Sequence, residues 1–167
     1  MRWDRLFTEL EARSADLVLD ERDALVDELR DGDWAATSWW TLLGGQVVLD
    51  VLGHGHVGGQ VVLANERLVQ LRGERVDHVL SNAAVLAVVS SERRADEIST
   101  VAAALGWGHV FRALRDAGAE VRIGRVDGST VEGTIVVVGR DFLRVRGETG
   151  RDHLLTFTSL AVVSGRR

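Results

Sequence analysis

The chain has 167 residues, 46% of them hydrophobic, with 20 basic and 25 acidic side chains and a net charge of −5. It has no cysteine, and every basic residue is arginine, which excludes disulfides, thiolate zinc sites, cysteine nucleophiles and Schiff-base lysines. No apolar run of membrane-spanning length and no secretory leader is recognised, so we expect a cytoplasmic protein that does not engage a membrane.

Residues 1–33 carry eleven acidic residues against five arginines. An apolar stripe at Trp3, Leu6, Phe7 and Leu10 follows helical spacing. We therefore predict an N-terminal helical segment at 1–33 that is acidic on its outer side.

The rest of the chain contains an internal repeat. Shifting the sequence by 74 positions aligns 44–90 with 118–164 and gives fourteen identities in one ungapped register. Gly59 then pairs with Gly133, and Leu80 with Leu154. Duplication explains this pattern, and it predicts one helix-plus-barrel domain at 34–90, a polar linker at 91–104 and a second helix-plus-barrel domain at 105–167.

Each copy is expected to open with a short helix that ends at a glycine, Gly44 in the first and Gly118 in the second. Five short strands follow, joined by tight turns. In FLRVR, alternation places Leu143 and Val145 inside and Arg144 and Arg146 outside. The predicted fold class is mainly β with helices (α+β), containing two duplicated five-stranded barrels, each closed or nearly closed.

The segment GHGHVG at 53–58 matches the glycine pattern of a dinucleotide-binding loop. That loop requires a helix directly after it, whereas the sequence continues as a strand, GQVVLAN, so a β-turn is the better interpretation. His54 and His56 in this turn could share a metal if Asp50 or Asp77 came close. Solvated turn histidines are the simpler reading, and we predict neither a cofactor nor a metal.

Five arginines of the second copy are the most suggestive surface feature. Their strand or turn positions place them outside, where they could contact RNA phosphates or an acidic partner: Arg122, Arg140, Arg144, Arg146 and Arg151. The competing interpretation is that exposed strands need charge to avoid edge-to-edge pairing and that arginine is the only cation here.

The helix-and-five-strand order, with VRIGRVDGSTVEGTIVVVGRDFLRVRG in the second copy, resembles the Sm-like and SH3-like small barrels. The order from MRWDRLF through a helix to two barrels also resembles an uncharacterised actinobacterial family, some members of which carry a label as Fis-type transcription regulators. No segment supplies the basic recognition helix that such a regulator needs. Sm proteins usually place an asparagine in the third strand, where the two copies read DFLRV and RLVQL; Asn65 lies in the preceding turn.

No nucleophile elbow and no converging set of catalytic groups is recognised, so we expect a protein that is not an enzyme and has no small-molecule substrate. We expect a binding or scaffold module that engages a protein partner or self-associates through its barrels. The alternative is binding of RNA or single-stranded nucleic acid through the arginine-bearing face of the second copy.

Overall fold

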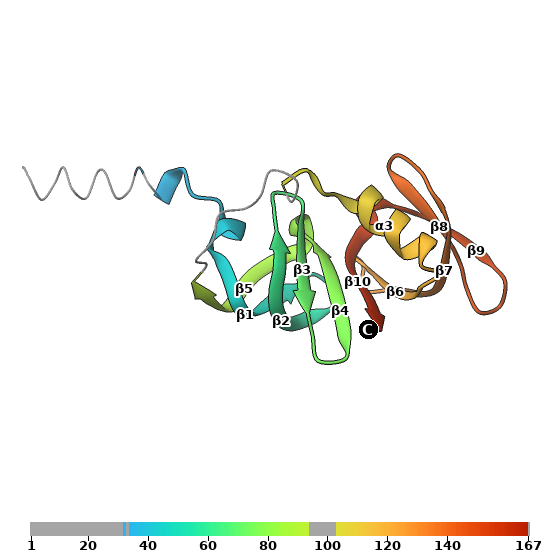
Figure 1. Cartoon of the computed structure of the whole chain (residues 1–167), viewed down its shortest axis with the longest axis horizontal. Helices are drawn as coiled ribbons and strands as arrows, with labels where there is room; N and C mark the ends of the chain where they lie inside the picture. Colours follow the sequence, from blue (N-terminus) through green and yellow to red (C-terminus); the bar gives the residue numbers. More distant parts are fainter. Residues whose placement is uncertain (1–31, 33, 94–102, 167) are drawn as a thin grey trace, which may run out of the picture. The chain divides into compact units, whose positions relative to one another are not determined.

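The computed structural model describes residues 32, 34–93 and 103–166 (Figure 1). The chain divides into two compact units, 1–38 and 39–167, and the second contains every described strand. The helical segment predicted at 1–33 and most of the linker predicted at 91–104 lie outside the described residues. None of the helices within the described ranges has both the length and the apolar character needed to cross a bilayer.

The second unit consists of two successive halves, which we call the first half (39–93) and the second half (107–166). The first half contains η1 (Trp39–Leu42), β1 (Leu43–Val51), β2 (Gly55–Ala64), β3 (Leu68–Arg72), β4 (Val76–Ser81), η2 (Asn82–Ala84) and β5 (Val85–Arg93). The second half contains α3 (Trp107–Asp116), β6 (Glu120–Arg125), β7 (Thr130–Val138), β8 (Phe142–Arg146), β9 (Asp152–Thr156), η3 (Phe157–Ser159) and β10 (Leu160–Arg166).

The ten strands form one continuous antiparallel sheet in the order β5-β1-β2-β3-β4-β10-β6-β7-β8-β9 (Figure 1). The fold is therefore mainly β, as predicted, but the sheet is not closed into barrels. The reason lies in the pairing of β4, which runs alongside β10 of the second half instead of β5 of its own half. The side of β4 that could have paired with β5, and so closed the first half into a barrel, pairs with β10 and joins the two halves.

The strand registers of the two halves repeat in the same way as the sequence does. The pair Val47↔Gly59 between β1 and β2 recurs 74 positions later as Val121↔Gly133 between β6 and β7. The irregularity between Val61 and Leu63 in the pairing of β2 with β3 recurs at the equivalent place in β7. A bulge kept at the same site in both copies shows that the two halves bend in the same way.

The single ungapped register predicted for the repeat is wrong beyond β3 and β8. Val69 pairs with Leu80 in the first half, whereas Leu143 pairs with Leu155 in the second. The equivalent of Leu80 is therefore Leu155, because the turn before β9 is one residue longer than the turn before β4. The shift of 74 positions applies again from Ser90 onward. In the pairing of β5 with β1, Val88 faces Leu49 and Ser90 faces Val48, so Val89 is an extra residue that restores this shift.

Each half has its own hydrophobic core, and β10 belongs to both. Ala161 and Val162 pack into the core of the first half, while Leu160 and Val163 pack into the core of the second. Successive residues of a strand point to opposite faces of the sheet, and the irregularity between Leu160 and Val162 in the pairing with β6 interrupts that alternation. With two residues in each core, β10 is the strand that the two halves share.

One of the two predicted helices forms. In the second copy, α3 ends at Ala117, and Gly118 follows with a φ of +61°, which is the helix-ending role expected of it. In the first copy the prediction of a helix that ends at Gly44 is wrong: Trp34 and Ala35 are helical and the 3-10 helix η1 follows, but β1 already begins at Leu43. Leu43 is buried in the first core and pairs with β5, so the chain is already extended at Gly44.

Candidate functional site

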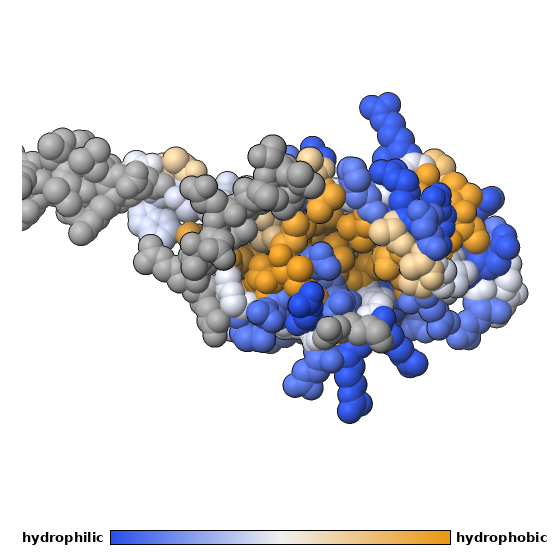
Figure 2. All heavy atoms as spheres, viewed as in Figure 1, coloured by the Kyte–Doolittle hydropathy of each residue, from blue (hydrophilic) through white to orange (hydrophobic). Residues whose placement is uncertain are grey.

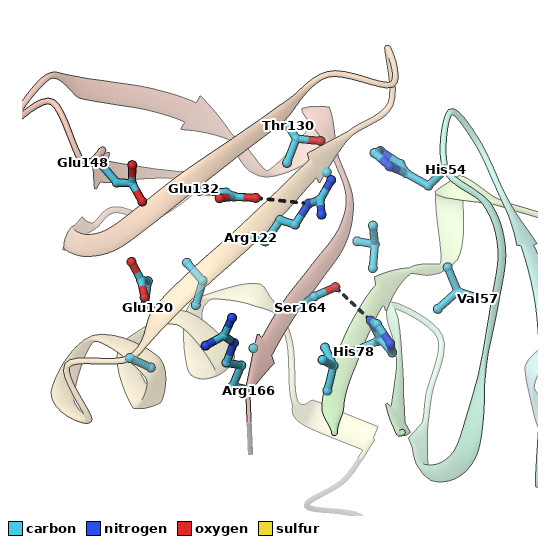
Figure 3. A pocket seen from close by; sticks show the side chains of 16 residues that line it. His54, Val57, His78, Glu120, Arg122, Thr130, Glu132, Glu148, Ser164 and Arg166 are labelled. Atoms are coloured by element: carbon cyan, nitrogen blue, oxygen red, sulfur yellow. Dashed lines mark hydrogen bonds and ion pairs between the residues drawn. The ribbon is translucent and has the colours of Figure 1, made fainter. Parts of the chain in front are cut away.

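Three of the five arginines singled out in the sequence form ion pairs with acidic residues. Arg122 on β6 forms an ion pair with Glu132 on β7, with 3.4 Å between Nε and Oε1 (Figure 3). Arg144 and Arg146 on β8 both reach Asp152 on β9, at 3.7 Å and 2.9 Å. These pairs cross between neighbouring strands, and two acidic residues, Glu132 and Asp152, are shared among three of the five candidate arginines.

Hydrogen bonding strengthens the pairing around Asp152. Arg146 donates to both oxygens of Asp152, from Nε at 2.9 Å and from Nη2 at 3.2 Å. These hydrogen bonds lower the pKa of Asp152 and raise the pKa of Arg146, since each favours the charged form of its partner. The two groups thus stay ionised and paired at neutral pH.

The remaining two candidates, Arg140 and Arg151, lie exposed in the turns before β8 and β9. The paired arginines lie on strands instead, and no ion pair of Arg140 or Arg151 is formed within the described parts of the chain. Arg151 comes directly before strand β9.

The GHGHVG segment forms a turn followed by strand β2, which confirms the β-turn interpretation. His54 does not remain solvated: its Nε2 lies 2.7 Å from the carbonyl oxygen of Arg125, and its ring lies over Gly124. His56 is exposed on β2, opposite Asp50 in β1. Across the described residues, no three His, Cys, Asp or Glu side chains gather as a metal site would require.

The two halves meet where β4 pairs with β10, and we call this pairing the internal junction. Its register runs from Leu80↔Val162 to Val76↔Arg166. His78 Nδ1 lies 2.8 Å from the hydroxyl of Ser164 on the opposite strand (Figure 3). Burial lowers the pKa of His78, and the carboxylate of Asp77 partly opposes that effect.

A cavity of about 780 Å³ lies beside the internal junction (Figure 3). The first half contributes His54 and His78 to its wall, and the second half contributes Arg122, Ser164 and Arg166. Arg122 is already paired with Glu132, and His78 with Ser164. The wall therefore has mixed charge and is partly satisfied by the protein itself, which gives no single ligand chemistry.

The outermost strands of the sheet, β5 and β9, each pair with one strand only among those described. Apolar side chains are exposed along both: Leu86 and Val89 on β5 are 60% and 53% exposed, and Leu154 on β9 is 64% exposed. Figure 2 shows apolar residues reaching the surface over the first half. In contrast, the run 160–163 of β10, which corresponds to this part of β5, is buried throughout.

Sequence reasoning missed these edges as the candidate site. The repeat assigned β5 and β10 to the same structural role, but their pairing distinguishes them: β10 lies between β4 and β6, while β5 pairs only with β1 among the described strands. The available signal was the apolar sequence VLAVV at 85–89, which is unusual for an edge strand. No protein-family model matches the chain, and no curated protein shows a significant match.

Proposed function

We propose that this chain is a non-enzymatic scaffold that self-associates head to tail, with β9 of one copy pairing with β5 of the next. In this proposal each five-stranded half is a small unit of the Sm-like kind, completed by a strand from its neighbour. The first half receives that strand from the same chain, as β10. The second half would receive it from another copy, as β5.

The observation that carries the proposal is the internal junction, which shows how one half accepts a strand from another. There, β10 supplies Ala161 and Val162 to the core of the first half. The second half has the same construction, but the outer side of β9 pairs with no strand among those described. The duplicated registers make β9 the equivalent of β4 and make β5 the equivalent of β10.

The equivalent residues are suited to the same pairing. Val79↔Val163 in the internal junction corresponds to Leu154 on β9 and Val88 on β5. Leu154 and Val88 are 64% and 40% exposed, whereas Val163 is 3% exposed. Pairing would remove this apolar surface from water and satisfy the backbone groups of both edges, which are the two gains that drive strand addition.

The arrangement uses two different surfaces of each copy, so it is a heterologous interface. Such interfaces form a ring when the rotation between copies closes and an open filament when it does not. Either product is a multivalent array with identical faces, which is a suitable form for a scaffold. The cross-strand pairing of Arg122, Arg144 and Arg146 with acidic residues favours this role over nucleic-acid binding.

The absence of native cysteine allows a direct test. In a variant carrying Val88→Cys and Leu154→Cys, a short thiol cross-linker should join different copies and give a ladder of covalent multimers on a denaturing gel. The matched control is Val79→Cys with Val163→Cys, because these two residues face each other across the internal junction of one chain. That variant should cross-link within one chain and give no multimers on the gel.

Light scattering over a range of concentrations provides the measurement without variants. We expect masses above the 18.2 kDa of one chain that increase with concentration. A single 18.2 kDa species up to millimolar concentration, together with no multimers from the Val88→Cys and Leu154→Cys variant, would rule the proposal out.

A further inference from the structure

The pairing of β9 with β5 of the next copy is here called the chain-to-chain junction. In it, a second half accepts a strand from a first half, which is the opposite of the internal junction. We propose that Asp50, in the copy that provides β5, packs over Gly128 of the copy that provides β9, and that this contact determines which halves can pair. This inference rests on the proposed head-to-tail assembly.

The internal junction contains a contact between a side chain of the first half and a bare glycine of the second. His54 extends from its own turn toward β6 (Figure 3), and a Cβ added at Gly124 would overlap the His54 ring. Nε2 of the same ring lies 2.7 Å from the carbonyl oxygen of Arg125. Because the ring occupies this space, the contact requires a residue without a side chain at position 124.

Asp50 on β1 holds the position that Gly124 holds on β6. Asp50 faces His56 in the pairing of β1 with β2, and 74 positions later Gly124 faces Thr130 in the pairing of β6 with β7. Asp50 is half-buried and lies between two buried core residues of β1, so its side chain points away from the first core. The first half therefore presents a carboxylate where the second half presents glycine backbone.

Gly128 holds the position of His54 in the turn that follows. A backbone hydrogen bond of 2.9 Å closes each turn, donated by His54 to the Val51 carbonyl after β1 and by Gly128 to the Arg125 carbonyl after β6. The second half thus has no side chain at the place from which the first half extends an imidazole. Gly128 has a φ of +83°, a conformation that glycine adopts freely and asparagine tolerates better than most residues.

The two junctions are therefore complementary in opposite senses. In the internal junction His54 fills the space over Gly124, whereas in the chain-to-chain junction Asp50 would fill the same space from the other side. Pairing two first halves would place His54 against Asp50, and two side chains would overlap. Pairing two second halves would place Gly128 against Gly124, and the empty space would forfeit packing contacts. First and second halves are therefore required to alternate along the assembly.

A groove on the first half independently marks the surface that the next copy would cover. It has a volume of about 600 Å³ and lies on the outer face of β1. Several of its residues are the equivalents, 74 positions earlier, of residues in the wall of the cavity beside the internal junction: Gln46, Val48, Gly58, Glu74 and Ser90. Because alternate residues of β1 share a face, the row of Gln46 and Val48 continues to Asp50. A neighbour seated over this groove would also reach Asp50.

An exchange of side-chain size tests the contact. Gly128→Asn places an amide against Asp50 and should raise the concentration at which half of the chains assemble, measured by light scattering, about tenfold or more. Adding Asp50→Gly removes the overlap and restores a side chain facing a glycine. The double variant should therefore return to within about threefold of the natural chain, although Asp50→Gly alone should weaken assembly about threefold by leaving a gap.

Two controls separate this contact from effects on folding. Gly118→Asn makes the same substitution at a φ of +61°, where an added Cβ meets no atom within 4 Å, and should leave assembly unchanged. Within one chain, the nearest atoms to a Cβ added at Gly128 all belong to Gly53 and none to Asp50. The effects of Gly128→Asn and Asp50→Gly on urea denaturation should therefore add at concentrations below those of assembly. A contact between copies predicts coupling in assembly without coupling in stability.

Substitutions of Asp50 alone provide a second test that leaves Gly128 in place. Asp50→Asn keeps the size of the side chain and should retain assembly, whereas Asp50→Phe should weaken it about tenfold or more by overlapping the turn of the neighbour. The inference is overturned if the chains assemble but Asp50→Gly does not rescue Gly128→Asn, or if Asp50→Asn and Asp50→Phe behave alike. Chains that do not assemble at all would contradict the proposed function itself.

Discussion

The imidazole of His54 in the turn before β2 lies on the backbone of Gly124 in β6, with its Nε2 2.7 Å from the Arg125 carbonyl oxygen. A Cβ added at Gly124 would overlap this ring. We expect Gly124→Ala to destabilise the fold by about 1–3 kcal/mol, the usual cost of inserting a group into a packed contact. Urea denaturation followed by tryptophan fluorescence would measure it.

Gly165 on β10 is the control for this substitution. An added Cβ there would meet no atom within 4 Å, and we expect Gly165→Ala to be nearly neutral. Combining Gly124→Ala with His54→Ala should cost less than the sum of the two single changes, because removing the ring removes the overlap. Simple additivity would show that His54 does not rest on Gly124 in solution.

Phe111 anchors α3 on the second core. It is fully buried, with Trp107 stacked on it at 5.1 Å between ring centroids and Phe157 tilted against it at 5.5 Å. Phe111→Ala should therefore reduce the free energy of unfolding by about 3–5 kcal/mol. Thermal denaturation would show a large fall in Tm, whereas Trp34→Ala at an exposed site should leave Tm nearly unchanged.

Asn65 is the one buried polar residue of the core among those described. Its Oδ1 accepts hydrogen bonds from the backbone N–H groups of Arg67 and Leu68, at 2.8 Å and 3.0 Å, and its Nδ2 donates to the Leu105 carbonyl at 3.0 Å. Asn65→Ala would leave these groups unpaired, at a cost of about 1–3 kcal/mol for each buried one. Asn65→Asp should retain part of the stability, because a carboxylate accepts both backbone hydrogen bonds but cannot donate to Leu105.

The sequence was sufficient to predict the strands and the repeat, because both depend on local information. Alternation places Leu143 and Val145 inside, and the structure buries both. Turn glycines and apolar runs likewise identify the strands without knowledge of their neighbours. The role predicted for Gly118 was also local, since a helix end needs a residue that tolerates positive φ.

The features that failed are those decided by distant residues. Gly44 resembles a helix end, yet Leu43 beside it is buried in the first core and paired with β5. The sequence predicts that His54 is a solvated turn residue, but the fold places its ring against Gly124 of β6. Nothing local distinguishes β5 from β10, because the difference between them is which strand lies alongside. The candidate site consists of the outer edges of β5 and β9, which depend on this pairing. The sequence alone therefore indicated the arginines instead.

The arginine face gives a prediction about nucleic acid. Because Asp152 holds both Arg144 and Arg146, the natural chain should bind a labelled mixed-sequence RNA weakly at physiological salt. Asp152→Asn releases both cations and should increase RNA affinity measured by fluorescence anisotropy, whereas Glu74→Gln should not. Tight binding by the natural chain that is lost in an Arg144→Ala and Arg146→Ala double variant would favour the nucleic-acid function.

The pH dependence of stability is set in part by His78. Burial lowers its pKa in the folded chain below the ordinary value of 6.5 that applies when the chain is unfolded. Above that value neither state binds the proton, and the full stability is present. As the pH falls below it, the unfolded chain takes up a proton that the folded chain resists, so stability is lost until the pH passes below the folded pKa.

Denaturation midpoints measured between about pH 8 and pH 5 should therefore decline toward acid, starting near the ordinary histidine value. His78→Gln should reduce this decline, because an amide can still hydrogen-bond to Ser164 but does not titrate. His56→Gln, at an exposed histidine, should leave the decline as it is. A decline of the same size in the His78→Gln variant would show that another group is responsible. The measurement belongs at protein concentrations below those at which copies associate, so that the internal junction is observed by itself.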